Sequence, residues 1–291
     1  LSSTVNKPLI IPNLVTEIGD GAFIGCKNLV SLIIPDSVTS IGPRAFYDCS
    51  SLASVTFGEN SKLETIGDNT FYQCTTLTSF IIPDSVTSIG VEAFYNCEKL
   101  NPVTIGNSVT EIGNGAFEGC SNLASVTIGD SVTSIGRSAF EGCSNLASVT
   151  FGQNIQLTTI NDTTFLGCSS LKSVNIPDSV KTIGRSAFYN NEVLTTVTFG
   201  ENSTLETIGN SAFSDCSKLV SVNIPASVTE IGREAFSDIS ANATITLKSG
   251  IKLTSFPGIS SVSSLSSYDF TTITSTTNGS IIFIINKNTN A

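Results

Sequence analysis

Phenylalanine recurs along this chain at a nearly fixed interval, and this repeat constrains the fold more strongly than any other feature of the sequence. Ten phenylalanines are spaced 23 residues apart, or 25 residues apart at three places. They are Phe23, Phe46, Phe71, Phe94, Phe117, Phe140, Phe165, Phe188, Phe213 and Phe236. A period in the twenties indicates a solenoid, because one small unit cannot bury its apolar face alone and must stack on its neighbours.

A single repeat shows how each unit is built. The string CSNLASVTIGDSVTSIGRSAFEG begins at Cys120, and Cys143 begins the next copy. Its expected core comprises Cys120, Leu123, Val126, Ile128, Val132, Ile135, Ala139 and Phe140. The same positions of other copies are expected in the same core, among them Phe46, Phe71, Phe94, Phe117 and Cys143. Residues 126–128 alternate and end at Gly129, which predicts a short strand paired in parallel with its copy in the next coil.

Two corners follow this strand in every repeat. The first carries proline or glycine, which predicts a turn, and the longer copies place their two extra residues there. A second glycine column runs from Gly19 to Gly232, with Asn161 as its one substitute. Because asparagine tolerates positive φ better than other side chains, we expect left-handed backbone at this second corner. Residues 137–142 then fit a short helical turn back to the next strand.

The strings IPDSVTSIG and AFxxCSxLxSV resemble the BspA-like, Treponema-type leucine-rich repeats over about residues 9 to 245. The resemblance implies a leucine-rich repeat solenoid of about ten coils of 23 to 25 residues. We expect short parallel strands and short helical turns, wound as a curved right-handed superhelix. Members of this family are typically secreted or surface-exposed proteins of bacteria and parasitic protists, linked to adhesion to host or matrix components. Their motif carries no catalytic residues.

Composition agrees with a secreted or cell-surface protein that is not an enzyme. The formal net charge of -10, from 14 basic and 24 acidic residues, argues against nucleic acid or an anionic membrane as a partner. Histidine, the commonest general base and metal ligand, is absent from the sequence. We therefore expect no catalytic residue, no metal and no cofactor.

No apolar run has the length of a membrane span, so we expect no membrane insertion in this segment. The sequence begins with neither methionine nor a signal-like segment. We take the chain to be a mature or excised piece of something longer.

All eight cysteines fall in one column of the repeat: Cys26, Cys49, Cys74, Cys97, Cys120, Cys143, Cys168 and Cys216. Parallel side chains on adjacent coils meet the dihedral angle of a disulfide poorly. Cys216 has no partner in the column, because Asn191 and Ile239 occupy the neighbouring copies. We favour buried structural thiols, with disulfides or metal sites as the alternatives.

Hydroxyl side chains form columns on the expected outer faces. A threonine-rich column on the strand face comprises Thr56, Thr104, Thr127, Thr150 and Thr198, beside a column of serines. A second face repeats Thr39, Thr87, Thr110, Thr133 and Thr229. We interpret these columns as small side chains that keep a sheet soluble. The alternative is a uniform array that binds a repetitive ligand, such as a polysaccharide or ice.

Three tyrosines occupy the position directly after the repeat phenylalanine in consecutive copies. Tyr47, Tyr72 and Tyr95 are then about 4.8 Å apart, one coil rise, and would form a stacked exposed stripe. Tyrosine is amphipathic and favoured at interfaces. We predict that these three residues contact a protein or a glycan on the convex side. The alternative is that each ring only shields its own turn.

Aspartates after the first corner, such as Asp36, Asp84, Asp130 and Asp178, raise the question of calcium. Their column is interrupted, so turn capping is the better account. Four N-x-S/T sequons are candidate glycosylation sites in a eukaryotic secretory route: Asn161, Asn202, Asn242 and Asn278.

The pattern decays beyond Phe236, which suggests two segments. We assign residues 1–245 to the solenoid and residues 246–291 to a C-terminal cap or to the start of a following β-rich domain. Asn278 and Gly279 lie between apolar runs and predict a hairpin turn. A cap is favoured, since the open end of a solenoid must be covered.

Three functions are compatible with these features. Adhesion to, or recognition of, host, matrix or glycan components is favoured. A structural element that self-associates end to end is the second, because strand edges at an uncapped end can pair. The third is binding of a repetitive ligand through the serine and threonine columns.

Overall fold

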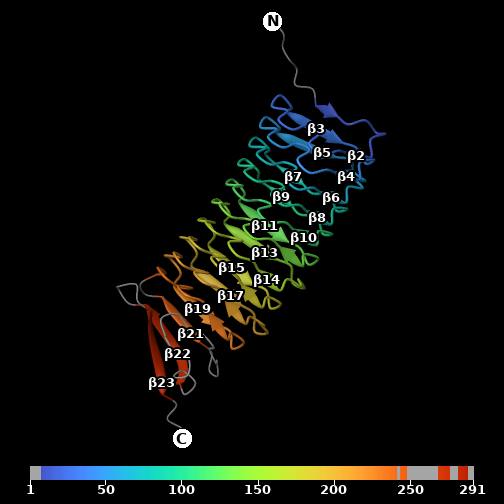
Figure 1. Ribbon diagram of the computed structural model, residues 1–291. Helices are drawn as coiled ribbons and strands as arrows, with labels where there is room; N and C mark the ends of the chain where they lie inside the picture. Colours follow the sequence, from blue (N-terminus) through green and yellow to red (C-terminus); the bar gives the residue numbers. More distant parts are fainter. Residues whose placement is uncertain (1–7, 241–242, 248–267, 276–280, 288–291) are drawn as a thin grey trace.

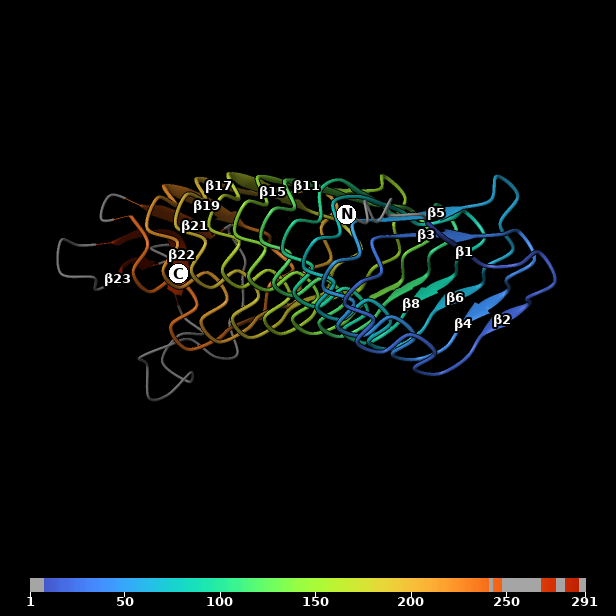
Figure 2. The ribbon, with the colours of Figure 1, turned by 90° about the horizontal axis from the view of Figure 1, so that it is seen from above.

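The structure is a computed structural model that describes residues 8–240, 243–247, 268–275 and 281–287. It shows a β-solenoid of about ten coils stacked into an elongated rod (Figure 1). Segments one repeat apart in the sequence lie side by side, as the period predicts. Each coil carries two short strands, and Figure 2 shows the two strand columns on separate sides of the rod, with loops completing each coil. We name the side with strands of up to four residues the first sheet side and the side with two-residue strands the second sheet side. The side formed by turns such as residues 137–142 is named the turn side.

The first sheet side contains strands of two to four residues in each coil. They are β1 (Leu9–Ile10), β3 (Ser31–Ile34), β5 (Ser54–Phe57), β7 (Phe80–Ile81), β9 (Val103–Thr104), β11 (Ser125–Ile128), β13 (Ser148–Phe151), β15 (Ser173–Ile176), β17 (Thr196–Phe199), β19 (Ser221–Ile224) and β21 (Thr244–Leu247). Except between β5 and β7, β9 and β11, and β13 and β15, neighbouring strands pair in parallel with equivalent residues opposite each other, as in Val126 opposite Val149. The predicted parallel pairing is therefore confirmed.

The second sheet side contains two-residue strands. They are β2 (Glu17–Ile18), β4 (Ser40–Ile41), β6 (Thr65–Ile66), β8 (Ser88–Ile89), β10 (Glu111–Ile112), β12 (Ser134–Ile135), β14 (Thr159–Ile160), β16 (Thr182–Ile183), β18 (Thr207–Ile208) and β20 (Glu230–Ile231). They form a six-stranded sheet from β2 to β12 and a four-stranded sheet from β14 to β20.

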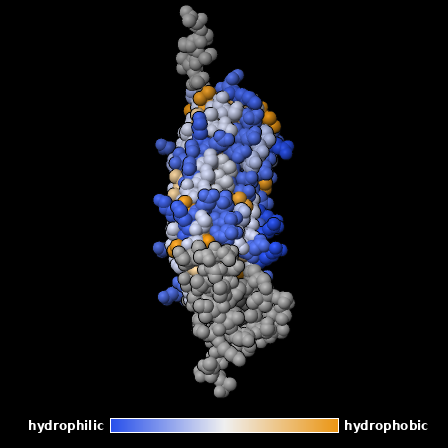
Figure 3. Space-filling view, turned by 90° about the vertical axis from the view of Figure 1, so that its left-hand side faces the viewer, coloured by the Kyte–Doolittle hydropathy of each residue, from blue (hydrophilic) through white to orange (hydrophobic). Residues whose placement is uncertain are grey.

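The repeat phenylalanines stack in one column inside the rod. Ring centroids of Phe94 and Phe117 are 5.1 Å apart with an interplanar angle of 1°, and those of Phe117 and Phe140 are 5.4 Å apart. Phe46, Phe71, Phe94, Phe117, Phe140, Cys120 and Cys143 are all fully buried. Figure 3 shows one face of the surface as mostly hydrophilic, with hydrophobic residues at the N-terminal end and in a few isolated places below.

The predicted short helical turns are absent from the described residues. Residues 137–142 form consecutive turns, in which Ser138 (φ 55°) and Gly142 (φ 68°) adopt left-handed backbone. Left-handed residues interrupt the helical hydrogen-bond ladder, so the backbone bonds to the next coil. The amide N of Phe140, for example, donates to the carbonyl O of Thr164 over 2.9 Å. The handedness and curvature of the superhelix stay predictions.

The prediction of left-handed backbone at the second glycine column is wrong. The left-handed residues lie two and six positions later, as in Arg44 and Asp48 after Gly42. The glycine column is instead a place of close approach between coils. A Cβ on Gly136 would collide with the backbone N of Asn114 in the preceding coil.

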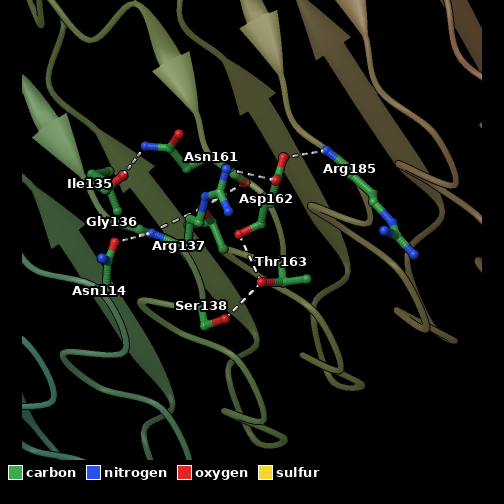
Figure 4. Close-up of polar contacts among 10 residues, drawn as sticks. Asn114, Ile135, Gly136, Arg137, Ser138, Asn161, Asp162, Thr163 and Arg185 are labelled. Carbon is green, nitrogen blue, oxygen red and sulfur yellow. Dashed lines mark hydrogen bonds and ion pairs between the residues drawn. The ribbon is translucent and has the colours of Figure 1, made fainter.

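Asn161 marks the division of the second sheet side. In the typical coil the glycine N donates to the preceding coil, as Gly184 does to the O of Ile160 over 2.7 Å. At Asn161 the side-chain Nδ2 donates to the O of Ile135 over 2.7 Å (Figure 4). The side chain replaces the backbone donor because the Cβ of Asn161 keeps its backbone from approaching the preceding coil as closely as a glycine does. This is the point at which the sheet divides between β12 and β14.

The described C-terminal residues continue the first sheet side. Strand β22 (Tyr268–Ser275) pairs antiparallel with β21, and β23 (Ile281–Lys287) pairs antiparallel with β22. The predicted turn at Asn278 and Gly279 lies outside the described residues. The division at residue 245, and the role of the second segment as a cap, stay predictions.

Candidate functional site

The tyrosine stripe, defined as Tyr47, Tyr72 and Tyr95, is a continuous ring stack on the turn side. The centroids of Tyr47 and Tyr72 are 4.5 Å apart with an interplanar angle of 2°. Those of Tyr72 and Tyr95 are 4.6 Å apart with an angle of 6°. The rings stack because each follows a buried phenylalanine in consecutive coils, so the coil spacing sets the ring spacing.

Local backbone geometry presents each tyrosine outward. Left-handed residues stand three positions before and one position after it, as Arg44 (φ 55°) and Asp48 (φ 54°) do around Tyr47. They lie in residues 43–48, which form consecutive turns. Phe46 can therefore point into the core while Tyr47 is half-buried at the surface.

The stacking determines which part of each ring a partner can touch. Stacking covers both faces of Tyr72 and the inner faces of Tyr47 and Tyr95, so the stripe presents ring edges and hydroxyl groups along most of its length. A sugar ring that binds by lying flat on an aromatic face has no such face at Tyr72. Burial between its neighbours is the main cause that raises the pKa of Tyr72, followed by the charges of Tyr47 and Tyr95. Tyr72 thus keeps its proton, as a hydrogen-bonding hydroxyl, at neutral pH.

A shallow groove accompanies the N-terminal part of the stripe. It has a volume of about 370 Å³ and is lined by Ile24, Arg44, Tyr47, Asn69, Tyr72 and Glu92. The side chain of Ile24, which precedes the stripe in the same column, is 53% exposed. Asn69 Nδ2 donates to Glu92 Oε2 over 2.9 Å, so the polar edge of the groove is held in place.

Carboxylates follow the stripe at its C-terminal end. Glu118 and Glu141 occupy the tyrosine position in the next two coils. Burial, followed by the negative charges of Glu141 and Glu92, raises the pKa of Glu118 to about 7. The sequence shows that the column changes to glutamate but not that Glu118 is partly buried. The tyrosine stripe therefore runs from an apolar end at Ile24 to an acidic end at Glu118.

Tyr189 occupies the same repeat position outside the stripe. Leu166 precedes it and Ser214 follows it in the column, so no tyrosine neighbours it there. A hydrogen bond to Asp215 is the main cause that raises its pKa, followed by the charge of that carboxylate. Tyr189 is a natural control for any property assigned to the stacked tyrosines.

The threonine column on the first sheet side is not a continuous array. Thr56, Thr104, Thr127, Thr150 and Thr198 are all exposed. Only Thr127 and Thr150 face each other in register, because Thr56 pairs with Ile33, Thr104 with Ile81 and Thr198 with Asn175. The sheet is also interrupted between β5 and β7, between β9 and β11, and between β13 and β15.

Threonines on the second sheet side use their hydroxyl groups within the protein. Thr110 Oγ1 donates to the carbonyl O of Thr87 over 3.1 Å, and Thr133 Oγ1 donates to that of Thr110 over 3.3 Å. Thr39 and Thr87 make the same bond to the coil before them. This column therefore binds coil to coil.

The cysteines are free, and seven of the eight are buried, Cys26 being half-buried. Each buried thiol bonds to a phenylalanine carbonyl of the preceding coil, as Cys120 Sγ does to the O of Phe94 over 3.2 Å. Asn191 reproduces this bond with Nδ2 to the O of Phe165 over 3.0 Å. Burial raises the pKa of these thiols, to about 11 for Cys49 and about 12 for Cys216, so they stay protonated and unreactive. Within the described residues, no three His, Cys, Asp or Glu side chains are grouped to hold a metal ion.

Two of the aspartates and one described sequon residue bond to a neighbouring coil. Asp36 Oδ1 accepts a bond from the N of Asn60 over 3.0 Å, and Asp130 Oδ1 accepts one from the N of Asn154 over 3.0 Å. Among the sequons, Asn202 is exposed, whereas the Nδ2 of Asn161 is held by the O of Ile135. Asn242 and Asn278 lie outside the described residues.

Known proteins share this repeat and this architecture. The chain matches the family model described as a BspA type leucine rich repeat region over residues 2–123, 64–194 and 158–288. No curated protein matches the chain. Among the described residues, no helix has the length and apolar character needed to span a membrane.

Several solved structures are similar to this chain. A leucine rich cell surface protein from Faecalibacterium prausnitzii is 29% identical with a TM-score of 0.47, covering 79% of this chain and 78% of that one. The pneumococcal vaccine antigen PcpA is 23% identical with a TM-score of 0.55, covering 83% and 72%. A leucine-rich repeat protein from Eubacterium ventriosum is 22% identical with a TM-score of 0.54, covering 87% and 84%. The last two show the same fold.

Proposed function

Because the chain belongs to the BspA-type leucine-rich repeat family, we propose that it is a non-enzymatic recognition module that binds a protein partner through the tyrosine stripe. The observation that carries this proposal is the stacked arrangement of Tyr47, Tyr72 and Tyr95 on the turn side. Placement outside the cell or at its surface, and adhesion as the biological role, follow from the family's typical members and belong to the same proposal.

The shape of the stripe favours a protein partner over a glycan. Tyrosine gives a large contact area with few rotatable bonds, which is why it is enriched in interface hot spots. The exposed ring edges and hydroxyl groups suit packing against side chains and hydrogen bonding to a peptide backbone. Arg44 and Glu92 flank the rings with opposite charges and would fix the orientation of the partner.

The first experiment is saturable binding of the purified chain to a panel of immobilised matrix proteins and glycans, measured by surface plasmon resonance. The variant Tyr47→Ala/Tyr72→Ala/Tyr95→Ala is measured beside the wild type. If each ring is a hot spot of about 2 kcal/mol, the variant loses binding by more than about 1000-fold. Thermal unfolding followed by circular dichroism checks that the fold is kept. Unchanged binding by a folded triple variant would overturn the proposal.

End-to-end association is a second candidate function. Strand β1 lies at the edge of its sheet, and Ile10 and Leu14 near that edge are 60% and 94% exposed. An apolar edge strand can pair with another chain. Growth of the weight-average mass with concentration, measured by light scattering, would support this function, and a constant monomer mass would exclude it.

A further inference from the structure

Exposed isoleucines on the first sheet side are not explained by the tyrosine stripe. Ile81 is 71% exposed, and it occupies the outward column in which the next three coils carry Thr104, Thr127 and Thr150. Threonine has the same β-branched shape and fills this position without exposing apolar surface. Ile10 and Ile33 also occupy the column and face each other in register. Three of the first four residues of this column are therefore isoleucine, with Thr56 between Ile33 and Ile81.

Ile81 borders a cleft where the sheet is interrupted. Strands β5 and β7 are joined by the single bridge between Ser54 and Ser79, and the first corner after β5 carries two extra residues. The cleft has a volume of about 450 Å³, which is within the size range of ligand pockets. Its apolar lining includes Val55, Phe57, Ile81 and Pro83.

The charged residues that line this cleft are both acidic. Glu59 lies on the inserted corner and Asp84 follows Pro83 in the next coil, and both are exposed. An apolar floor with two carboxylates at its rim is complementary to a large aliphatic side chain beside a cationic one. A segment with acidic side chains would be repelled by the same rim.

The chain contains a second cleft of the same construction with different chemistry. It lies four coils later, where β13 and β15 are not paired, and its volume is about 470 Å³. Asn175 takes the place of Ile81, and Gln153 takes the place of Glu59. Because the two clefts share their position in the coil, the second is an internal control for the first.

We propose that the first cleft, between β5 and β7, binds an extended protein segment in which a large aliphatic residue stands beside lysine or arginine. The aliphatic side chain packs on Ile81 and Phe57, and the cation lies between Glu59 and Asp84. This site is on the first sheet side, whereas the tyrosine stripe is on the turn side. The proposal therefore does not depend on the function assigned to the stripe.

The test uses three capped peptides and the full chain. The peptide Ser-Lys-Leu-Lys-Ser is compared with versions that carry glutamate for both lysines or serine for the leucine. Binding is followed by NMR of methyl-labelled isoleucine, with Ile81 assigned from the Ile81→Asn variant. We expect saturable shifts of the Ile81 methyl signal with the first peptide, and affinities about 10- to 100-fold lower for the other two peptides.

Matched variants then move the site within the chain. Ile81→Asn makes the first cleft resemble the second and is expected to weaken binding of Ser-Lys-Leu-Lys-Ser about 10- to 100-fold. Asn175→Ile/Gln153→Glu makes the second cleft resemble the first and is expected to raise the stoichiometry from one peptide per chain to two. Tyr47→Ala/Tyr72→Ala/Tyr95→Ala is expected to bind this peptide as the wild type does.

Two results would overturn the proposal. One is equal binding of the lysine and glutamate peptides, since the acidic rim would then play no part. The other is unchanged binding by Ile81→Asn. Both cleft variants place at an exposed position a residue that the chain already uses at an equivalent one, and circular dichroism verifies that they fold.

Discussion

The coils before residue 100 and the coils after it share one core but have different surfaces. The phenylalanine stack continues through both regions at nearly constant spacing, from 5.2 Å between Phe23 and Phe46 to 5.4 Å between Phe213 and Phe236. Among the residues whose exposure the structure describes, six of the seven exposed large hydrophobic residues lie at or before Val91, and the seventh is Val220. The tyrosine stripe also lies in the first region.

This difference separates the residues that fix the fold from those available for binding. Inward positions tolerate few residue types, because each side chain packs against its copy above and below. Outward positions whose side chains bond to no neighbouring coil can differ from coil to coil, unlike the threonines of the second sheet side. Recognition is therefore expected in the N-terminal coils, where apolar and aromatic side chains replace the hydroxyl side chains of later coils.

The largest expected change in unfolding free energy comes from two variants that test whether the core is equivalent in the two regions. Phe71→Ala and Phe188→Ala each remove a buried ring that stacks on both sides. Each variant should lose about 3–5 kcal/mol of unfolding free energy, because a large cavity opens in a packed column. Urea unfolding followed by circular dichroism measures the loss. Wild-type stability in either variant would show that the stack is not a uniform core.

A second comparison concerns the close approach of coils at the glycine column. Gly136→Ala places a Cβ against the backbone of Asn114, whereas a Cβ on Gly19 has nothing within 4 Å. The first variant should lose about 1–3 kcal/mol of unfolding free energy through overpacking, and Gly19→Ala should change it little. Equal unfolding midpoints for the two variants would contradict close packing as the reason for glycine.

A smaller effect is expected in the cysteine column, which other residues interrupt only in the coils after residue 100. Asn191 is fully buried, and its Oδ1 has no hydrogen-bond partner among the described residues. Asn191→Cys keeps a donor toward the O of Phe165 and removes the unpartnered oxygen. We expect a gain of about 1 kcal/mol in unfolding free energy, since an unsatisfied buried acceptor is costly. A loss of stability would show that the side-chain amide of Asn191 makes a stabilising interaction in addition to its bond to Phe165.

The smallest effect is a pH dependence at the boundary between the two regions. The pKa of Glu118 is about 7 in the folded protein, above the ordinary value of 4.5. A raised carboxyl pKa stabilises the fold below the unfolded pKa, and this stabilisation disappears as the pH rises toward 7. Glu118→Gln should therefore reduce the fall in melting temperature between pH 5 and pH 8. Identical pH profiles for wild type and variant would contradict burial of this carboxylate.

The core and the coil order could be predicted from the sequence because both follow from one period. The stacking of Tyr47, Tyr72 and Tyr95 also follows from that period, since equivalent residues lie above one another. The orientation of the rings does not follow from the period. This orientation determines that the ring edges face a partner. The partial burial of Glu118 and the clefts beside Ile81 and Asn175 depend on how neighbouring coils separate.

The incorrect predictions have a common physical cause. Six residues after the glycine column, the left-handed positions carry mostly glycine, asparagine or aspartate, types that favour positive φ. Two residues after it they include Arg44, Ser138 and Thr163, residue types with no special preference for positive φ. Hydrogen bonds between coils hold them there, and local propensity does not report those bonds. Left-handed backbone was wrongly expected at the glycine column for the same reason, because these glycines are required by the close approach of a neighbouring coil and not by their own φ.

The most direct test of the account compares two tyrosine variants on the same protein partner. Tyr47→Ala/Tyr72→Ala/Tyr95→Ala removes the stacked rings, and Tyr189→Ala removes the tyrosine at the same repeat position outside the stripe. The account predicts that a partner found in the binding panel is lost by the triple variant and bound with wild-type affinity by Tyr189→Ala. Loss of binding by both variants, or by neither, would contradict recognition through the tyrosine stripe.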